Sequence, residues 1–475
     1  MNARHGWEFD MKKQKTNMVT SVTPQPQIVS TPTSEYVDSA SKEYAIYTAQ
    51  NRAIPSVCDG LKDGQRKALW TIRNKSDKIK TISLSGEMIS ANIFLHGDVS
   101  ASDTISRLAA PYLNNVPLLE GLGAFGTRVA PDGWGAPRYT YVKRNKATQA
   151  LVYPDLDIVP LKPNYDGSVQ EPENFLPIIP MVLLNGVSGI AVGWSTDILP
   201  HSLKDVVKAT LSAIDGDPIP KIMPSFDYLQ TQVRELAPNS YEFTGKVVME
   251  SGTTVRVTEL PPDLSLERFK ERLNKWEDEG QIHTYTDRST KTINVEVRFR
   301  RGQLDGWSEQ QVIDFLKLKS KTTQRFVVLH FNNKSIRQYD SASDLIQEFV
   351  AWRLNWYTHR YTRMRDLLIQ DLNWACAVQA CFKGKLPTWL PKAQDRSAVK
   401  HKVLELTQGI DLSDDQVDRI VSLPTYRWAQ DQIARIAQEI VQLSEQIVEY
   451  EQILQDDQKK RAIYRSEVAQ LLNQF

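Results

Sequence analysis

Cysteine is scarce in this 475-residue chain, and long apolar runs are missing altogether. The three cysteines, Cys58, Cys376 and Cys381, make no disulfide framework, and no Cys/His spacing resembles a zinc site. No stretch has the length of a membrane span, and the N-terminus lacks the basic start, apolar segment and small-residue cleavage site of a signal peptide. We therefore expect a cytoplasmic protein that makes no membrane contact.

Nucleotide-binding signatures are also missing. There is no G-x-x-x-x-G-K-S/T loop, so we expect that this chain does not hydrolyse ATP. Charge of one sign is not in excess, because the net charge is only +1, and this value alone gives no indication of a nucleic-acid ligand. Between Arg52 and Gln149, however, Lys and Arg outnumber Asp and Glu. This basic patch is either a solvated face or a surface that binds nucleic acid.

The first third of the chain is predicted to be helical after a tail. The length predicts about two to four domains. Residues 1–34 include a Thr/Pro/Gln/Ser-rich stretch with little apolar content and are expected to form a disordered tail. Residues 35–165 show helical patterns broken by Gly and Pro, and an apolar-faced stretch at 103–113 follows His96-Gly97-Asp98. A helix with Asp98 at or near its N-cap would direct backbone N–H groups toward a phosphate.

The middle of the chain, residues 166–340, is predicted to be a separate α+β domain. β-branched, partly alternating runs are typical of strands, and they occur at residues 246–249, 253–258, 291–299 and 325–331. Helical patterns occur at residues 266–276 and 310–318.

The C-terminal third is helical throughout. Apolar residues recur at alternating steps of three and four, as in a coiled-coil seam, at Tyr426, Ala429, Ile433, Ile436, Ile440, Leu443, Ile447, Tyr450 and Leu454. A similar stripe runs from Val350 to Leu372. One such stripe is typical of ordinary domain core, but two matching stripes favour an antiparallel coiled coil. Its arms are predicted at 341–378 and 425–470, with a small helical cap at 379–424 between them.

Cations are concentrated around one tyrosine in the stretch Gly133-Trp-Gly-Ala-Pro-Arg-Tyr-Thr-Tyr-Val-Lys-Arg. A phenol becomes an effective nucleophile when positive charge stabilises its anion, and Arg138 can supply that charge to Tyr139 as a rigid fork. A tyrosine in a basic stretch more often packs or contacts a phosphate. The spacing alone therefore leaves both interpretations open.

Four further blocks occur in a characteristic order. They are 52–67 (Arg-Ala-Ile-Pro to Gly-Gln-Arg-Lys), 94–98 (Phe-Leu-His-Gly-Asp), 126–128 (Gly-Thr-Arg) ahead of 137–139 (Pro-Arg-Tyr), and 171–196 (Glu-Pro-Glu-Asn-Phe to Gly-Trp-Ser-Thr). This order resembles the breakage-reunion subunit of type IIA DNA topoisomerases. The similarity runs from about residue 51 to 203, continues weakly at 255–262 and recovers at 349–363.

The resemblance implies a multidomain α+β fold. Residues 35–165 would form a winged-helix DNA-gate domain with the active-site tyrosine, and residues 166–340 a tower domain. The arms at 341–378 and 425–470 would form the long antiparallel coiled coil, and residues 379–424 a helical C-gate dimerisation cap.

The resemblance also implies roles for single residues. The nucleophile falls on Tyr139 and its neighbouring arginine on Arg138, while Arg52 and His96 match positions that hold the scissile phosphate. Taken alone, His96 would more often be a structural histidine. DNA-backbone contacts are expected at Lys62, Gln65, Arg66, Lys67, Lys143 and Arg144. Ile179 matches the isoleucine that wedges between base pairs of bent DNA.

Some positions depart from the bacterial members of the family. Val99 stands one residue after the His-Gly-Asp motif, where gyrase and topoisomerase IV subunits usually have a serine whose hydroxyl helps anchor quinolones. Asp103 keeps the acidic position of that drug pocket. We therefore expect quinolones to trap cleavage complexes weakly, and potent trapping in a DNA-cleavage assay would contradict this. Gln65 and Lys67 also replace common bacterial residues, and the motif wording is closer to eukaryotic and phage enzymes.

The resemblance also implies which functional groups a partner subunit must supply. Asp155-Leu-Asp157 has the D-x-D form of the family's Mg²⁺ site but lacks its upstream strand and glutamate, so a surface loop is favoured and no metal ligand is assigned. The Mg²⁺ carboxylates and the ATPase would lie on a separate large subunit, and a homodimer would hold double-stranded DNA. Because the sequence stops at Phe475 without a β-pinwheel, it is similar to the medium subunit of a tailed-bacteriophage enzyme, which would act in the host cytoplasm.

These features predict the DNA-cleaving and rejoining subunit of an ATP-dependent type II topoisomerase that relaxes supercoils through a transient 5′-phosphotyrosine break. Two alternatives keep the same scaffold: a non-catalytic architectural DNA clamp, and a gyrase A-type chain without its wrapping domain. A tyrosine recombinase is less favoured, because its multiple Arg/His set near a C-terminal tyrosine is not evident.

Overall fold

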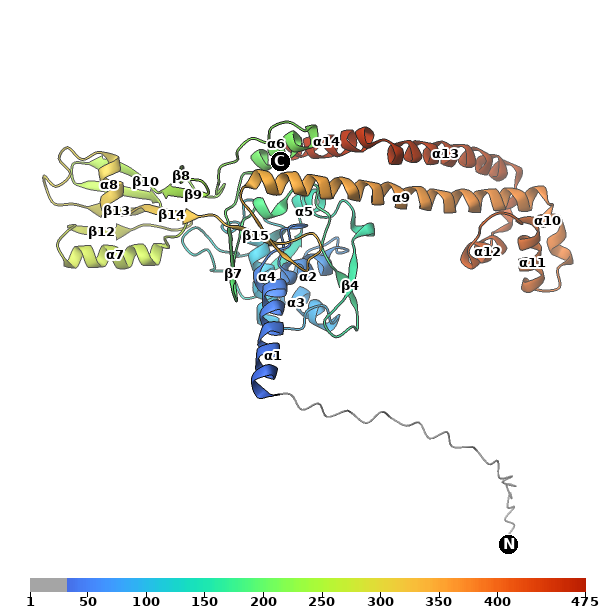
Figure 1. Cartoon of the computed structure of the whole chain (residues 1–475), viewed down its shortest axis with the longest axis horizontal. Helices are drawn as coiled ribbons and strands as arrows, with labels where there is room; N and C mark the ends of the chain where they lie inside the picture. Colours follow the sequence, from blue (N-terminus) through green and yellow to red (C-terminus); the bar gives the residue numbers. More distant parts are fainter. Residues whose placement is uncertain (1–31) are drawn as a thin grey trace, which may run out of the picture. The chain divides into compact units, whose positions relative to one another are not determined.

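The computed structural model describes residues 32–475, which form a mixed α/β structure (Figure 1). Within the described residues, the chain divides into two units at a boundary between Ala45 and Ile46. Helix α1 (Thr33–Thr48) begins in the first unit and ends in the second. The tail predicted at 1–34 lies outside the described residues except at its C-terminal end, where Thr33 and Ser34 already belong to α1. No helix within residues 32–475 is long and apolar enough to cross a membrane.

Residues 49–158 fold as short helices around a small antiparallel sheet. The helices are η1 (Ala49–Ala53), α2 (Asp63–Ile72), α3 (Thr81–Ser90), α4 (Asp98–Ala109), α5 (Lys146–Leu151) and η2 (Leu156–Ile158). The sheet has the order β1-β3-β2, from β1 (Ile79–Lys80), β3 (Tyr141–Arg144) and β2 (Leu119–Leu122). The helix predicted after the His-Gly-Asp motif is α4, although its N-cap is Gly97 rather than Asp98.

One apolar core joins this part to segments distant in the sequence. These segments are β4 (Leu161–Pro163), β5 (Gln170–Pro172), η3 (Met181–Leu183), β6 (Val187–Ala191), β7 (Trp194–Ile198), α6 (Leu203–Asp215), β15 (Phe326–Leu329) and β16 (Ile336–Tyr339). Val57 N donates to Leu329 O at 2.9 Å and Leu329 N to Pro55 O at 2.8 Å, which ties β15 to the start of the core. The segment predicted as one separate domain, 166–340, is therefore not separate at its ends, because both ends pack into the same core as residues 57–159.

Residues 232–323, which we call the extension, have an apolar core of their own. The strands form the sheets β14-β9-β8 and β10-β11-β13-β12, from β8 (Gln232–Ala237), β9 (Ser240–Thr244), β10 (Lys246–Ser251), β11 (Thr254–Glu259), β12 (Thr284–Asp287), β13 (Val295–Arg298) and β14 (Lys319–Thr323). The helices are α7 (Leu266–Asp278) and α8 (Glu309–Phe315). The strands predicted near 246, 253 and 291 and both predicted helices are confirmed, and β8, β9, β12 and β14 were not predicted.

The C-terminal third is helical, as its periodicity predicts. It contains α9 (Ala342–Lys383), α10 (Leu386–Trp389), η4 (Leu390–Lys392), α11 (Arg396–Leu406), α12 (Asp414–Val421), η5 (Thr425–Trp428), α13 (Gln430–Gln455) and α14 (Asp457–Gln474). Helices α9 and α13 lie side by side over a long stretch, and Tyr361 contacts Tyr450 with ring centroids 5.4 Å apart (Figure 1). Helices α10–α12 share a small core with the adjoining ends of α9 and α13.

Candidate functional site

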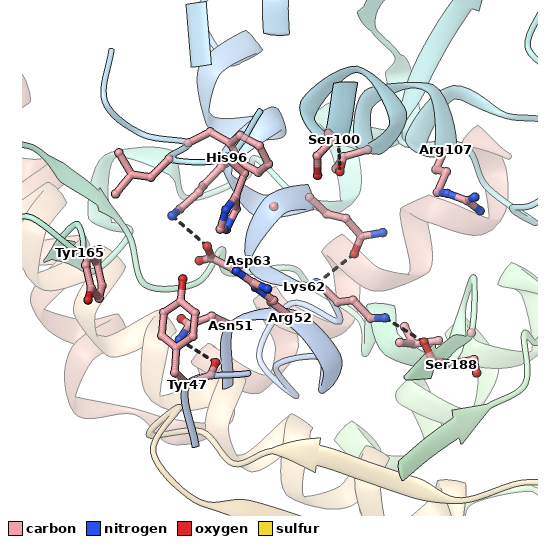
Figure 2. Close-up of a pocket in the computed structure, with 18 residues that line it drawn as sticks. Tyr47, Asn51, Arg52, Lys62, Asp63, His96, Ser100, Arg107, Tyr165 and Ser188 are labelled. Atoms are coloured by element: carbon pink, nitrogen blue, oxygen red, sulfur yellow. Dashed lines mark hydrogen bonds and ion pairs between the residues drawn. The ribbon is translucent and has the colours of Figure 1, made fainter. Parts of the chain in front are cut away.

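A cavity of about 610 Å³ lies where η1, α2, the start of α4 and the β6–β7 hairpin meet. Five of the residues predicted from the sequence line this cavity (Figure 2): Arg52, Lys62, Gln65, Lys67 and His96. They come from separate parts of the sequence, so the fold, not proximity in the chain, brings them together. The cavity also has an aromatic side, where Tyr47 and Tyr165 make an edge contact with ring centroids 5.9 Å apart.

The lysines of this cavity already have partners. Lys62 Nζ donates to the carbonyl oxygen of Ser188 in β6 at 2.8 Å. Burial, followed by the positive charge of Arg107, lowers the pKa of Lys62. Lys67 Nζ lies 2.9 Å from Asp63 and 3.0 Å from Glu171. Burial alone would lower the pKa of Lys67, but these two carboxylates outweigh it and raise that pKa.

Arg66 is a structural residue rather than a surface contact. Its side chain is 6% exposed, and its Nε lies 2.7 Å from Asp59 Oδ2. Its Nη2 also donates to Asp59 Oδ1 and to the carbonyl oxygen of Leu61, each at 3.0 Å. The expected backbone contact from Arg66 is therefore corrected, because removing this guanidinium would leave Asp59 buried and without its charge partner.

Arg52 and His96 both line the cavity (Figure 2). Both side chains are exposed, and the Arg52 guanidinium carbon lies 5.7 Å from the centroid of the Tyr47 ring. His96 contacts Phe94 edge-on at 5.3 Å. Burial comes first among the causes that lower the pKa of His96, followed by the positive charges of Arg52 and Lys67.

The arginine is placed by a close contact between two backbones. At Gly189 in β6 a Cβ would collide with the carbonyl oxygen of Ala53, the last residue of η1. Glycine is thus required for the hairpin to lie against the turn that carries Arg52. The same approach places Ser188 within reach of Lys62.

The first turn of α4 carries the positions related to the drug pocket. Val99 is 77% exposed, directly after Asp98, the first residue of the helix. Asp103 lies one turn further on and accepts a hydrogen bond from Arg107 Nε at 3.1 Å. The next residue, Ser100, carries a hydroxyl and lines the cavity.

Tyr139 lies on a different part of the surface. It is 70% exposed, and the Arg138 guanidinium carbon lies 4.9 Å from the centroid of its ring. Its backbone is fixed from both sides by the start of α3, where Thr81 N donates to Thr140 O at 3.0 Å and Ile82 N to Pro137 O at 3.1 Å. Tyr139 and Arg138 are absent from the lining of the Arg52–His96 cavity within the described chain.

The two basic residues that follow Tyr139, Lys143 and Arg144, lie on β3. Lys143 Nζ pairs with Glu120 of β2 at 3.0 Å, and Arg144 Nε donates to the carbonyl oxygen of Lys75 at 2.8 Å. Both side chains are half-buried. Their partners support the small sheet below Tyr139, and contact with DNA stays a prediction for both.

Ile179 is buried in the apolar core with no exposed surface. It is therefore not available to enter a base step, and the assignment of the wedge to Ile179 is corrected. The isoleucine of the same block that faces solvent is Ile190, which is 86% exposed at the end of the β6–β7 hairpin. Val192 follows it at 70% exposure. The exposed apolar tip of the hairpin is the feature that motif matching missed.

Asp155 is also not a surface residue. It is 3% exposed and forms ion pairs with Arg353 and Arg360 of α9, the latter at 2.5 Å. The favoured surface-loop interpretation holds for Asp157, which is exposed, but not for Asp155. Because its carboxylate is committed to two guanidinium groups, Asp155 anchors α9 to the core.

Two arginines of the site region, Arg107 and Arg128, were given no role from the sequence, although Arg128 belongs to the Gly-Thr-Arg motif. Arg107 lines the cavity and lies 3.3 Å from Asp132. Arg128 is buried and pairs with Glu259 at 2.7 Å. For Arg107, the one available sequence signal was its spacing from Asp103, because i and i+4 residues are neighbours on a helix. The partner of Arg128 lies too far along the chain for any local signal.

Comparison with known proteins defines the family. The family model that describes the A subunits of DNA gyrase and topoisomerase IV matches residues 52–469. The chain therefore belongs to this family, and the resemblance recognised from its motifs is confirmed.

Individual relatives come from a phage and from animals. The DNA topoisomerase medium subunit of Enterobacteria phage T4 is 31% identical over 414 residues, which cover 85% of this chain and 91% of that protein. Human DNA topoisomerase 2-alpha is 32% identical over 343 residues, 68% of this chain. This chain covers only 22% of the length of the human protein.

A solved structure shares the fold. The crystal structure of the Plasmodium falciparum topoisomerase II DNA-binding, cleavage and re-ligation domain superposes with a TM-score of 0.78. The sequences are 21% identical, and the match covers 93% of this chain and 66% of that one.

Proposed function

We propose that this chain is the DNA-cleaving and rejoining subunit of a type II DNA topoisomerase. The observation that carries the proposal is Tyr139, an exposed phenol with the Arg138 guanidinium against its ring, on a backbone fixed by α3. The family of the chain and its similarity to the phage T4 medium subunit support the same role.

In the proposed reaction, the oxygen of Tyr139 attacks a DNA phosphorus atom. The new phosphotyrosine bond replaces one phosphodiester bond, and the 3′-oxygen of the cut strand leaves. Because one ester replaces another, the bond energy is retained, and attack by the 3′-hydroxyl reseals the strand. Positive charge from Arg138 and Arg52, together with a hydrogen bond from His96, stabilises the transition state where the phosphate gains charge.

The site is incomplete within one copy of the chain. Tyr139 does not line the cavity that holds Arg52 and His96, and backbone hydrogen bonds from the start of α3 hold the segment on either side of Tyr139. We therefore propose that two copies form a twofold dimer in which Tyr139 of one copy faces the cavity of the other. Two such sites would cut both strands of a duplex.

The remaining parts would have the roles expected for the family. We propose that residues 35–165 act as a winged-helix DNA gate, that the extension is the tower, and that α9 and α13 form the coiled coil. Residues 379–424 would make the C-gate contact between copies. A second duplex would pass through the cleaved one, with relaxation of supercoils as the result.

Mg²⁺ and ATP would be handled by a large partner subunit. Within residues 32–475 no group of three or more His, Cys, Asp or Glu side chains could hold a metal ion. The best sequence candidate, Asp155, is neutralised by two arginines. The donors among residues 32–475 do not fit a Mg²⁺ site. We therefore propose that the carboxylates for the ion come from the partner and that the complex acts in the cytoplasm of the cell.

The exposed hairpin tip is proposed as the wedge that bends DNA. Ile190→Ala should reduce DNA bending and cleavage while leaving thermal stability nearly unchanged, because Ile190 is 86% exposed. Ile179→Ala is the matched control, since removing this buried side chain should lower the free energy of unfolding by about 2–5 kcal/mol. Fluorescence energy transfer between duplex ends measures the bend. Normal bending by Ile190→Ala would exclude the wedge.

His96 makes DNA binding depend on pH. Its pKa is lowered in the free protein by burial and by Arg52 and Lys67, and a phosphate nearby would raise it. A group whose pKa rises on binding takes up a proton, so DNA affinity should increase as pH falls through the pKa of His96 in the complex toward its lowered pKa in the free protein, by up to about tenfold for each unit by which binding raises that pKa. Titration of a labelled duplex measures this. His96→Gln should lose that part of the pH dependence, and an identical profile would contradict the contact.

A further inference from the structure

The loop that carries the nucleophile, residues 123–140, is a compact lobe rather than a flexible connection. Gly135 N donates to Ala124 O at 2.9 Å, and Phe125 and Trp134 form an antiparallel bridge at the base of the lobe. Gly126 has φ +85°, and a Cβ there would collide with the carbonyl oxygen of Pro131. The lobe is therefore a closed turn, and its position sets the position of the segment that leads to Tyr139.

Two anchors hold the lobe on the side of the core that contains α3 and α4. The start of α3 binds the backbone on both sides of Tyr139. Arg107 of α4 lies 3.3 Å from Asp132, and its guanidinium carbon lies 5.3 Å from the Trp134 ring centroid. The Arg107–Asp132 pair is weak, because its side chains are 49% and 65% exposed and water screens their charges.

A third anchor is buried and reaches the extension. Arg128 Nε lies 2.7 Å from Glu259 Oε1, at the end of β11, and the side chains are 8% and 7% exposed. Arg128 Nη2 also donates to Leu260 O at 2.9 Å. Glu259 accepts further hydrogen bonds from Leu260 N at 3.0 Å and from Gln230 N at 3.3 Å. Both oxygens of the carboxylate are thus satisfied, which a buried ion pair requires to be stable.

The Arg128–Glu259 pair connects two different apolar cores. Val129, the next residue, packs against the core of the extension, while Phe125 at the base of the lobe belongs to the core below the cavity. The lobe therefore bridges the two cores, and Arg128 and Val129 are its contacts with the extension. Removing either charge would leave the other buried and uncompensated, so the lobe would leave the extension.

We propose that Arg128 is a positioning residue for Tyr139, and that its ion pair with Glu259 couples the placement of the nucleophile to the extension. This inference rests on the proposed cleavage function. Arg128 itself touches neither the phenol nor the DNA phosphate in this account. It acts through the lobe, whose base lies five residues before Tyr139, as the sequence from Trp134 to Tyr139 shows.

Single-turnover cleavage of a labelled duplex by the complete complex, with Mg²⁺ and the large subunit, tests the proposal. Arg128→Gln and Glu259→Gln should each slow formation of the covalent complex about 100-fold, the effect expected when a reacting group is displaced by about 1 Å. The dissociation constant for DNA should stay within about threefold, because charged contacts with the backbone are kept. Hydrogen exchange should become faster in peptides from residues 123–140.

A matched control separates positioning from general loss of stability. Val312→Ala removes buried apolar volume from α8 in the core of the extension and leaves both members of the Arg128–Glu259 pair unchanged. It should cleave at the wild-type rate. Wild-type cleavage by folded Arg128→Gln, or an equal loss in Val312→Ala, would overturn the inference.

Two further outcomes of the cleavage experiment also need an interpretation. If Arg128→Gln does not fold, Arg128→Lys decides, because a lysine keeps the charge but not both hydrogen bonds. A loss of cleavage at unchanged DNA affinity then supports positioning, and a wild-type rate overturns it. If the wild-type complex itself forms no covalent link with DNA, the proposed function fails, whatever the variants do.

Discussion

Tyr139→Phe should abolish covalent attachment of this protein to DNA. Loss of the single attacking oxygen removes the bond-forming atom, so the yield of cleavage complexes should fall by a factor on the order of 10⁴ or more. The variant should fold normally, because the hydroxyl belongs to a side chain that is 70% exposed. Denaturing gels with end-labelled DNA, Mg²⁺ and the large subunit measure the yield.

DNA binding provides the control for this variant. The basic side chains around the cavity are unchanged in Tyr139→Phe, so its dissociation constant should match that of the wild type. Tyr141→Phe alters a phenol two residues away, in β3, and should cleave normally. Relaxation of supercoiled DNA by Tyr139→Phe at the wild-type rate would defeat the assignment.

Mixed dimers should regain one cleavage site from two inactive variants. Arg52→Ala and Tyr139→Phe homodimers should each lose cleavage, by about 10²–10³-fold for Arg52 as a residue that stabilises transition-state charge. In a heterodimer, Tyr139 of the Arg52→Ala copy would face the intact cavity of the other copy. One site is then complete and the other lacks both groups, so the heterodimer should nick one strand of each duplex.

The opposite arrangement predicts a different product. If Tyr139 used Arg52 of its own copy, each site of the heterodimer would lack one group and no nicks would accumulate. Differently tagged copies, purified as the heterodimer, make the comparison direct. A heterodimer without nicking activity would contradict a site shared between copies.

Local patterns in the sequence predicted several elements but not how they pack. Strands near residues 246, 253 and 291 and helices at 266–276 and 310–318 were found because periodicity and β-branching are local properties. The predicted boundaries of the middle domain do not match the ends of the extension, and the reason is physical. Strand β15 bonds to residues 55–57 through backbone groups, and such a pairing across the chain leaves no trace in the side-chain pattern.

The predicted site residues show the same contrast between what local motifs reveal and what only the fold reveals. Motif order selected Arg52 and His96, and the fold brings them into one cavity. It also selected Ile179 and Arg66, which are buried. A motif gives the order of the residues but does not tell which of their side chains face the core. Ile190 could have been found from its place between two glycines in Gly189-Ile-Ala-Val-Gly193, typical of an exposed hairpin. Burial of Arg128 against Glu259 depends on tertiary structure alone.

The most direct measurement maps the covalent link between protein and DNA. The complete complex would be incubated with a duplex and Mg²⁺, denatured, digested with protease and nuclease, and the nucleotide-bearing peptide sequenced by mass spectrometry. The account predicts a 5′-phosphotyrosine bond on Tyr139 and no other modified side chain. Attachment at a different residue, or cut DNA ends that carry no peptide, would contradict it.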